Sequence, residues 1–236
     1  MELTINCPDC GKTLKVTVVA EDAPRTEIIR KVATPTTWQE IAEKIKSGKA
    51  REFLSVGDIV PFEMKDGQKV NAVVAEIDPY GENEVAFVIE DCISNRHSIN
   101  KSGSNTGGWR DCEMRKYLNT TIYDLLPDDL KEVIAERTIK QTENDEDLIS
   151  KDKLWLLSCN EVGLEYDTTD KDDVHFSLFK DERSRIKQQD GETTWYWLRS
   201  PNPDYSISFW CVYTSGDGYY INVGNSYGVA WGFLVK

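Results

Sequence analysis

Positive charge is scarce in this chain, and between residues 201 and 233 Lys and Arg are missing altogether. Over the 236 residues, 28 Lys and Arg stand against 41 Asp and Glu, which gives a net charge of −13. Because proteins bind phosphate backbones through basic surfaces, we expect no nucleic-acid partner. No apolar run reaches the roughly eighteen residues of a membrane span, so we expect no membrane insertion.

A secretory signal is also missing. The first residues, Met1 to Thr4, lack a basic region followed by an apolar one, which predicts synthesis in the cytoplasm. The single cysteines lie in apolar surroundings, and in a reducing compartment we expect them to be buried free thiols. They are Cys92, Cys112, Cys159 and Cys211.

Histidine, a common catalytic residue, is also scarce and occurs only at His97 and His175. Gly103, Gly107 and Gly108 are not followed by the Lys-Ser/Thr pair of a phosphate-binding loop. Glycoside cleavage by a pair of carboxylates is an alternative, although no spacing in the sequence places two carboxylates together. We therefore predict that the protein is not an enzyme.

Residues 1–35 are predicted to form a small separate element. Cys7 and Cys10 make a Cys-x-x-Cys turn of the zinc-ribbon type, and the strand-like run Leu14–Val19 follows. A tetrahedral zinc site needs a second pair of ligands, and the chain has no second Cys-x-x-Cys. The alternatives are a ribbon that has lost its metal, a site shared between two chains, or a redox pair. Zinc at Cys7 and Cys10 is the one cofactor hypothesis that the sequence offers.

Residues 36–236 are predicted to form the main domain, with an α+β fold. Thr37 and Glu40 make a capping box, which predicts a short amphipathic helix that ends at Gly48. Strands are then expected at 59–62, 69–77 and 84–89, joined as a meander whose middle strand is covered on both faces.

Further elements are expected along the rest of the main domain. They are a helix capped by Asp111, a second helix opened by Pro127, a solvated acidic loop at 142–147, a buried strand at 154–157 and a further strand at 195–198. The acidic loop lacks the central Gly and terminal Glu of an EF-hand, so calcium binding there is the weaker alternative.

The segment from 201 to 233 combines a frame of Trp, Val, Gly and Phe with Tyr, Ser, Asn and Asp, and it also lacks Glu and Gln. Antibody loops favour Tyr, Ser and Asn, because Tyr gives rigid contact area and Ser and Asn give adaptable hydrogen bonds. An ordinary Tyr-rich strand meander is the alternative. The predicted ligand-binding residues are Tyr205, Ser206, Ser208, Phe209, Tyr213, Ser215, Asp217, Tyr219, Tyr220, Asn222, Asn225, Ser226 and Tyr227.

Strand alternation gives this segment an expected inside and outside. We predict that Tyr213, Tyr220 and Tyr227 are exposed on one face, together with the Ser, Asp and Asn side chains around them. The fixed apolar residues Trp210, Val212 and Phe233 are then expected beneath them.

Several motifs occur in a fixed order along residues 36–236. Trp197–Pro201 reads Trp-Leu-Arg-Ser-Pro, a Val and a Gly follow at 212 and 216, and Gly228-Val229 with Phe233 closes the segment. Further motifs lie upstream, at residues 56–58, 89–92, 108–119, 126–127 and 153–158. In this order of elements the chain resembles the C-type-lectin-like variable proteins of diversity-generating retroelements, found in bacteria and phages. Many relatives close with Gly-Val-Arg-Pro, whereas this chain has Ala230-Trp231.

The resemblance implies a C-type-lectin-like fold, with short helices on a twisted, mostly antiparallel sheet, preceded here by the zinc-ribbon-like element. It also implies adenine-directed mutagenesis of Asn codons, which yields Tyr, Ser, Asn and Asp but never Lys, Glu, Gln or Trp. The implied function is non-catalytic display of a variable surface to a protein or cell-surface ligand. Incorporation into a phage virion and assembly into a homo-oligomer are further alternatives.

The same fold leaves two alternatives. One is a lectin-like enzyme related to sulfatase-modifying factors, and the other is a carbohydrate-binding module. The enzymes need specific active-site cysteines, and Cys211 alone does not supply them.

Overall fold

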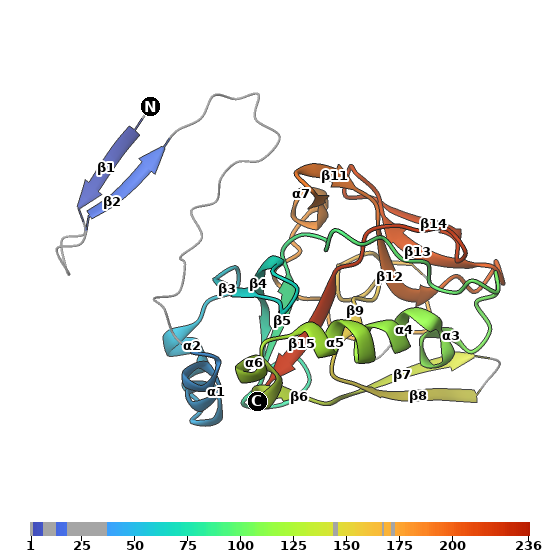
Figure 1. The fold of residues 1–236 in the computed structure, drawn as a ribbon, viewed down its shortest axis with the longest axis horizontal. Coiled ribbons are helices and arrows are strands. Elements are labelled where there is room, and N and C mark those ends of the chain that lie inside the picture. Colours follow the sequence, from blue (N-terminus) through green and yellow to red (C-terminus); the bar gives the residue numbers. More distant parts are fainter. Residues whose placement is uncertain (1, 7–12, 18–36, 144–145, 167, 171–172) are drawn as a thin grey trace. The chain divides into compact units, whose positions relative to one another are not determined.

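The computed structural model describes residues 2–6, 13–17, 37–143, 146–166, 168–170 and 173–236 (Figure 1). The chain divides into two units, residues 1–31 and 32–236, so the boundary lies slightly before the predicted one at 35. In the first unit β1 (Glu2–Asn6) pairs antiparallel with β2 (Thr13–Thr17). Cys7 and Cys10, the predicted zinc ligands, lie outside the described residues.

The second unit begins with the helix that the capping box predicts. In α1 (Trp38–Lys46) the Thr37 side chain accepts from the Glu40 amide, and the Glu40 carboxylate accepts from the Thr37 amide. The apolar face of α1 is buried, and Gly48 follows the helix with a left-handed φ of +72°. A short helix, α2 (Ala50–Phe53), comes next. Both parts of the helix prediction are confirmed.

A six-stranded antiparallel sheet forms the centre of this unit. Its strands are β3 (Ile59–Glu63), β4 (Lys69–Ile77), β5 (Val85–Ile89), β15 (Trp231–Val235), β6 (Ile134–Ala135) and β9 (Trp155–Leu156). The predicted meander is confirmed as β3, β4 and β5, and most of β4 is buried on both faces. The C-terminal strand β15 runs between β5 and β6, where Phe233 stacks on Phe87 with ring centroids 5.5 Å apart.

Short helices follow β5 in the chain. They are α3 (Gly108–Asp111), α4 (Glu113–Tyr117), the π-helical turn η1 (Leu118–Ile122), α5 (Tyr123–Leu125) and α6 (Asp128–Val133). The predicted cap at Asp111 is wrong. Cys112 caps α4 instead, with its sulfur accepting from the Arg115 amide at 3.3 Å, while Asp111 ends α3 and pairs with Arg110. The cap lies one residue later because Cys112, not Asp111, has the extended backbone that a capping residue needs.

The predicted acidic loop at 142–147 is largely strand. β7 (Arg137–Glu143) and β8 (Glu146–Asp152) form an antiparallel hairpin that brings Thr142 opposite Asp147. Buried and exposed side chains alternate along both strands. This alternation favours strands although the segment is highly charged. The charged residues near the turn lie on the exposed side or at the end of this hairpin.

The last part of the chain forms a second sheet, at the upper right of Figure 1. It orders β12 (Tyr196–Pro201), β13 (Ser208–Val212) and β14 (Gly218–Asn222), so β14 lies at an edge. Beside it lie α7 (Glu182–Arg185) and the hairpin of β10 (Lys187–Gln189) and β11 (Glu192–Thr194). The fold is therefore mixed α+β with short helices and mostly antiparallel strands. Within the described ranges no helix has both the length and the apolar character to cross a membrane.

Candidate functional site

The β13–β14 hairpin carries aromatic side chains on both of its faces. In the register of the two strands Trp210 lies opposite Tyr220, and Cys211 lies opposite Tyr219. Because neighbouring residues of a strand point to opposite faces, Tyr219 and Tyr220 leave β14 on different sides. Their rings still contact each other, with centroids 5.4 Å apart, and so join the two faces around the edge strand.

On one face the rings of Tyr166, Trp210, Tyr220 and Tyr205 follow one another, and we call them the Trp210 group. Tyr166 stacks on Trp210 at 3.9 Å between centroids, with the ring planes 7° apart. Trp210 meets Tyr220 edge to face at 5.6 Å, and Tyr220 stacks on Tyr205 at 4.8 Å. Offset stacks and edge-to-face contacts are the favourable arrangements of aromatic rings.

On the other face the rings gather around Trp195, and we call them the Trp195 group. Tyr213 lies 3.9 Å from Trp195 between centroids, Tyr227 stacks on Trp195 at 5.3 Å, and Tyr219 reaches it at 6.0 Å. Tyr227 also contacts Trp197, whose indole nitrogen donates to the carbonyl of His97 at 2.8 Å. This group is anchored in the core through Trp197, which is fully buried.

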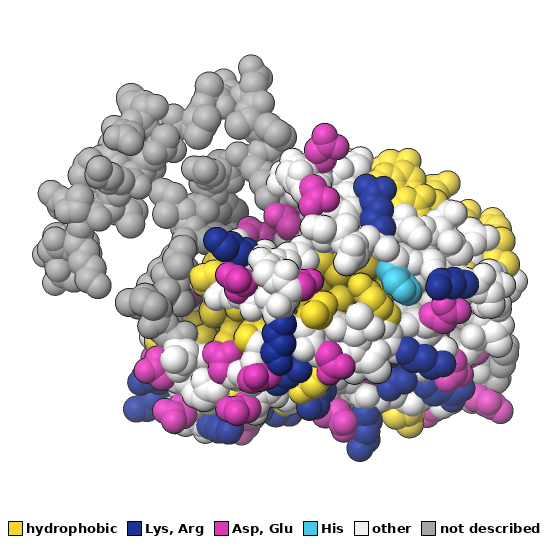
Figure 2. Space-filling model, in the orientation of Figure 1, with side chains coloured by type: hydrophobic (Ala, Val, Ile, Leu, Met, Phe, Trp, Pro, Cys, Tyr) yellow, Lys and Arg dark blue, Asp and Glu magenta, His cyan; other side chains and the backbone are white. Residues whose placement is uncertain are grey.

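Together the two groups form a continuous aromatic surface, which we call the aromatic belt. Tyr205 is 50% exposed, Tyr219 47% and Tyr166 37%, and most of the other rings are half-buried. Figure 2 shows apolar and aromatic side chains gathered along the upper right edge of the molecule, where Figure 1 draws β13 and β14. The belt offers large, rigid ring surface together with phenol hydroxyls.

Small polar side chains surround the belt. The predicted residues Ser206, Ser215, Asp217, Asn222, Asn225 and Ser226 are all exposed. The Ser215 hydroxyl donates to Asp217 at 2.8 Å, and the side-chain Oδ1 of Asn222 accepts from the Gly224 amide at 2.8 Å. These turns hold the loops at the ends of β14.

Two of the predicted ligand-binding residues are core residues. Phe209 is fully buried and Ser208 is 5% exposed, so neither can meet a ligand, and both predictions are wrong. β13 is the middle strand of its sheet and is covered on both faces, so alternation gives it no fully exposed face.

The predicted tyrosine row also needs correction. Tyr213 and Tyr227 belong to the Trp195 group, whereas Tyr220 belongs to the Trp210 group on the other face of the hairpin. Trp210, predicted to be buried, is half-exposed under Tyr166. Val212 and Phe233 are fully buried, as predicted.

Two phenols of the belt, Tyr220 and Tyr166, have a raised pKa. A hydrogen bond with Tyr205 raises the pKa of Tyr220, and the nearby carboxylate of Asp204 adds to this. Burial raises the pKa of Tyr166, and the charge of Asp217 acts in the same direction. Both hydroxyls therefore remain donors at neutral pH.

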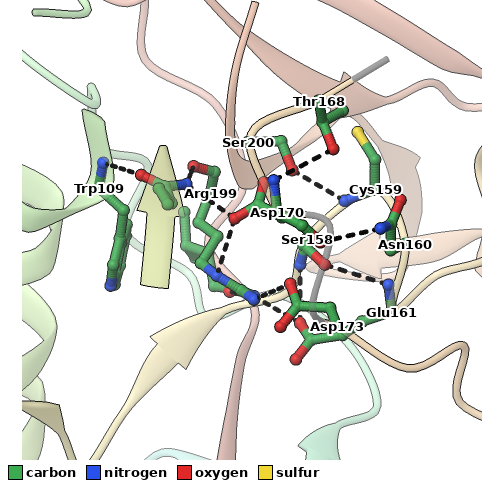
Figure 3. Close-up of polar contacts among 12 residues, drawn as sticks. Trp109, Ser158, Cys159, Asn160, Glu161, Thr168, Asp170, Asp173, Arg199 and Ser200 are labelled. Atoms are coloured by element: carbon green, nitrogen blue, oxygen red, sulfur yellow. Dashed lines mark hydrogen bonds and ion pairs between the residues drawn. The ribbon is translucent and has the colours of Figure 1, made fainter. Parts of the chain in front are cut away.

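A buried cluster of charges surrounds Arg199 (Figure 3). Arg199, from the Trp-Leu-Arg-Ser-Pro motif, is fully buried on β12. Its guanidinium donates to Glu161 at 2.5 Å, to Asp173 and to the carbonyl of Leu156 at 3.0 Å, and lies 3.6 Å from Asp170. Arg199 thereby connects β12 to the loop after β9.

Arg137, on β7, completes the cluster. It pairs with Glu161 and Asp173, and its guanidinium lies over the rings of Tyr80 and Trp155, 3.8 Å and 4.7 Å from their centroids. Burial opposes ionisation of Glu161, but the two arginines outweigh it and lower its pKa to about 2. Burial raises the pKa of Asp173 to about 6. The cluster has three carboxylates and two guanidinium groups.

Two glycines of the C-terminal motif are held by close backbone packing. A Cβ at Gly216 would overlap the carbonyl oxygen of Glu182, and Arg185 donates to the Gly216 carbonyl at 2.7 Å. A Cβ at Gly228 would lie 2.7 Å from the sulfur of Cys92 and 2.8 Å from the carbonyl oxygen of Trp195. These contacts fix the turn and the return segment of the hairpin.

Sequence reasoning missed two members of the belt. Trp195 is the first residue of the strand predicted at 195–198, and its large aromatic ring was the available signal. Tyr166 stands in a charged, irregular segment, and only the folded contact with Trp210 identifies it.

Metal and thiol chemistry find little support in the part of the chain that the structure describes. No cluster of three or more His, Cys, Asp or Glu there is arranged to hold a metal ion. Cys92, Cys112, Cys159 and Cys211 are buried free thiols, as predicted. Burial raises the pKa of Cys92, Cys112 and Cys211 to about 12, so these thiols are protonated at neutral pH.

Comparison with known proteins identified a match to a protein family. A model of the family described as Domain of unknown function (DUF6273) matches residues 83–236. This span contains the whole aromatic belt and, apart from Tyr80, the buried charge cluster. No match was found among curated proteins or among solved structures.

Proposed function

The chain belongs to the DUF6273 family, and we propose that it is a non-catalytic ligand-binding protein that displays its aromatic belt to a protein or cell-surface ligand. In this proposal the fold is C-type-lectin-like, and a diversity-generating retroelement varies the surface around β14. The protein is made in the cytoplasm and is carried by a phage or a bacterium. The exposed, continuous belt is the observation that carries the proposal.

The belt supports ligand binding because its rings are both exposed and held in place. Tyr205 and Tyr219 leave about half of their surface free, yet each contacts at least one other ring. Tyrosines with this combination are enriched at binding hot spots, since a preordered ring loses little entropy on binding. A contiguous exposed apolar patch on a protein often marks an interaction site.

The separation between packed core residues and exposed surface residues supports diversification of the surface. The exposed positions carry Tyr, Ser, Asn and Asp, which adenine-directed mutagenesis of Asn codons can supply. The positions that such mutagenesis should spare are those fixed by packing, namely Arg199, Gly216 and Gly228. Changes at the surface positions would therefore leave the core contacts intact.

The alternatives have weaker support. Thiol catalysis at Cys211 would need a thiolate, and burial raises the pKa of Cys211 to about 12. A carbohydrate-binding module is the second candidate, favoured by the exposed tyrosines Tyr205 and Tyr219, against which a sugar ring could pack.

We expect sister copies of the gene to differ mainly between Tyr205 and Tyr227. Within that range the substitutions should fall at exposed positions such as Tyr205, Ser215, Tyr219 and Asn222, while Gly216 stays unchanged. Sequencing of sister clones, together with a search of the neighbouring DNA for a template repeat and a reverse transcriptase, measures this. Substitutions spread evenly along the chain would rule the mechanism out.

We also expect the belt to tolerate truncation. Tyr205→Ala and Tyr219→Ala should each change the free energy of unfolding by only about 0.5–1 kcal/mol, because exposed side chains contribute little to stability. The matched control is Tyr196→Ala, since Tyr196 is buried and its hydroxyl donates to the Arg185 carbonyl at 2.8 Å. Thermal melts of the three variants compare them directly. Tyr205→Ala and Tyr219→Ala variants as unstable as Tyr196→Ala would make the belt a structural core.

A further inference from the structure

The Trp210 group has a carboxylate at each of its two ends. Asp204 precedes Tyr205, whose ring stacks on Tyr220, and its charge acts on the Tyr220 phenol. Asp217 precedes Gly218, whose carbonyl accepts from the Tyr166 hydroxyl at 3.3 Å, and its charge acts on the Tyr166 phenol. Both carboxylates are exposed, so a bound ligand could reach them together with the rings between them.

No exposed cation from the same segment balances these charges. Residues 201–233 contain neither Lys nor Arg. Arg185 lies close enough to act on Tyr166, but it is buried and donates to the carbonyls of Gly216 and Val162. The exposed face of the Trp210 group therefore combines negative charge with aromatic ring faces.

This combination favours a cationic partner. An Arg or Lys side chain over a Tyr or Trp ring is attracted by the negative face of the ring, and the attraction is stronger where water is excluded. The planar guanidinium of Arg can stack on a ring and donate to a carboxylate at the same time. The chain as a whole, with its net charge of −13, would attract such a partner over a distance.

We propose that the Trp210 group binds a basic segment of a partner protein, with Arg or Lys side chains over the rings of Tyr205 and Tyr220 and paired with Asp204 and Asp217. This inference rests on the proposed ligand-binding function and names the chemistry of its partner. The Trp195 group then contributes apolar contact on the other face of β14.

Selection of peptides from a phage-displayed random library, on the full-length protein, tests the inference. Four baits are used in parallel at physiological salt. They are the wild type, the double variant Asp204→Asn with Asp217→Asn, the control Asp124→Asn with Glu63→Gln, and the double variant Tyr205→Ala with Tyr220→Ala. The first two double variants remove the same number of negative charges, and Asp124 and Glu63 are exposed residues on α5 and β3.

The wild type and the control should enrich peptides rich in Arg or Lys. The Asp204/Asp217 variant should bind the selected peptides at least about tenfold more weakly, and so should the Tyr205/Tyr220 variant. Equal weakening by the control would reduce the effect to overall charge and overturn the inference. Enriched peptides without basic residues that still depend on Tyr205 and Tyr220 would overturn the inference and leave the proposed function standing. The absence of any peptide that depends on Tyr205 and Tyr220 would contradict both.

Discussion

Replacing Arg199 with methionine should lower the free energy of unfolding by about 3–5 kcal/mol, because it leaves buried negative charge without its counter-ion. Arg199 is fully enclosed and contacts Glu161, Asp170 and Asp173. In the variant only Arg137 would remain to balance these carboxylates. Methionine fills much of the volume, so the loss would come from charge rather than from a cavity.

Urea denaturation followed by circular dichroism measures this loss. The matched control is Arg110→Met, since Arg110 pairs with Asp111 at the surface and both side chains are well exposed. Exposed pairs contribute about 0–1 kcal/mol, so the control should stay close to the wild type. Arg199→Met within about 1 kcal/mol of the wild type would mean that the cluster does not hold the fold together.

The loss in the Arg199→Met variant should shrink as the pH falls toward about 6. Burial raises the pKa of Asp173 to about 6 in the wild type, and the positive charge of Arg199 acts against this rise. Without Arg199 the pKa of Asp173 in the folded state should be higher still, whereas in an unfolded chain an aspartate has a pKa of about 3.9. Between the higher value and about 6 the folded variant takes up a proton that the folded wild type does not, so acidification over this range stabilises the variant more than the wild type. Protonation of Asp173 also removes one of the carboxylates that Arg199 no longer balances.

Local patterns in the sequence predicted much of the fold. The capping box at Thr37 and Glu40 and the meander of β3, β4 and β5 each depend on residues near one another in the chain. The acidic loop prediction failed because charge and exposure were taken as signs of a loop. Along β7 and β8 the charged residues alternate with Ile139 and Leu148, and that alternation makes them strands.

The candidate site was predicted only in part, because it depends on contacts between distant segments. Composition identified Tyr205 and Tyr219 as ligand-binding residues, and both are exposed. The three tyrosines that strand alternation predicted to be exposed, Tyr213, Tyr220 and Tyr227, are half-buried. It could not tell that β13 is a central strand, which buries Phe209 and separates the tyrosines onto two faces. Tyr166 reaches the belt from a loop far from β13 in sequence, and no local pattern encodes that contact.

The motif residues illustrate the same limit. The Trp-Leu-Arg-Ser-Pro motif and the glycine at 216 were recognisable as fixed positions, but their physical reasons lie in other segments. Arg199 is fixed by carboxylates that follow β9, and Gly216 is fixed by the backbone of α7. The motif therefore identified which positions are fixed, but it did not identify the contacts that fix them.

Gly216→Ala should destabilise the protein by about 3 kcal/mol and loosen the hairpin that carries the belt. Gly216 has a φ of +92°, which costs an alanine roughly 1–2 kcal/mol. An alanine Cβ would also overlap the Glu182 carbonyl oxygen, and overpacking of this kind adds about 1–3 kcal/mol. Because Arg185 donates to the Gly216 carbonyl, the displaced turn would lose that hydrogen bond too.

Gly67→Ala separates the two causes. Gly67 has nearly the same φ, +89°, but a Cβ there would meet no atom within 4 Å, so its alanine variant should show the backbone cost alone. Urea denaturation gives both free energies, and hydrogen exchange of the β14 amides reports on the hairpin itself. Equal losses in the two variants would mean that the turn is not held against α7. A larger loss at Gly216, with faster exchange along β14, would establish that the packing of this turn on α7 keeps the exposed rings of the belt in place.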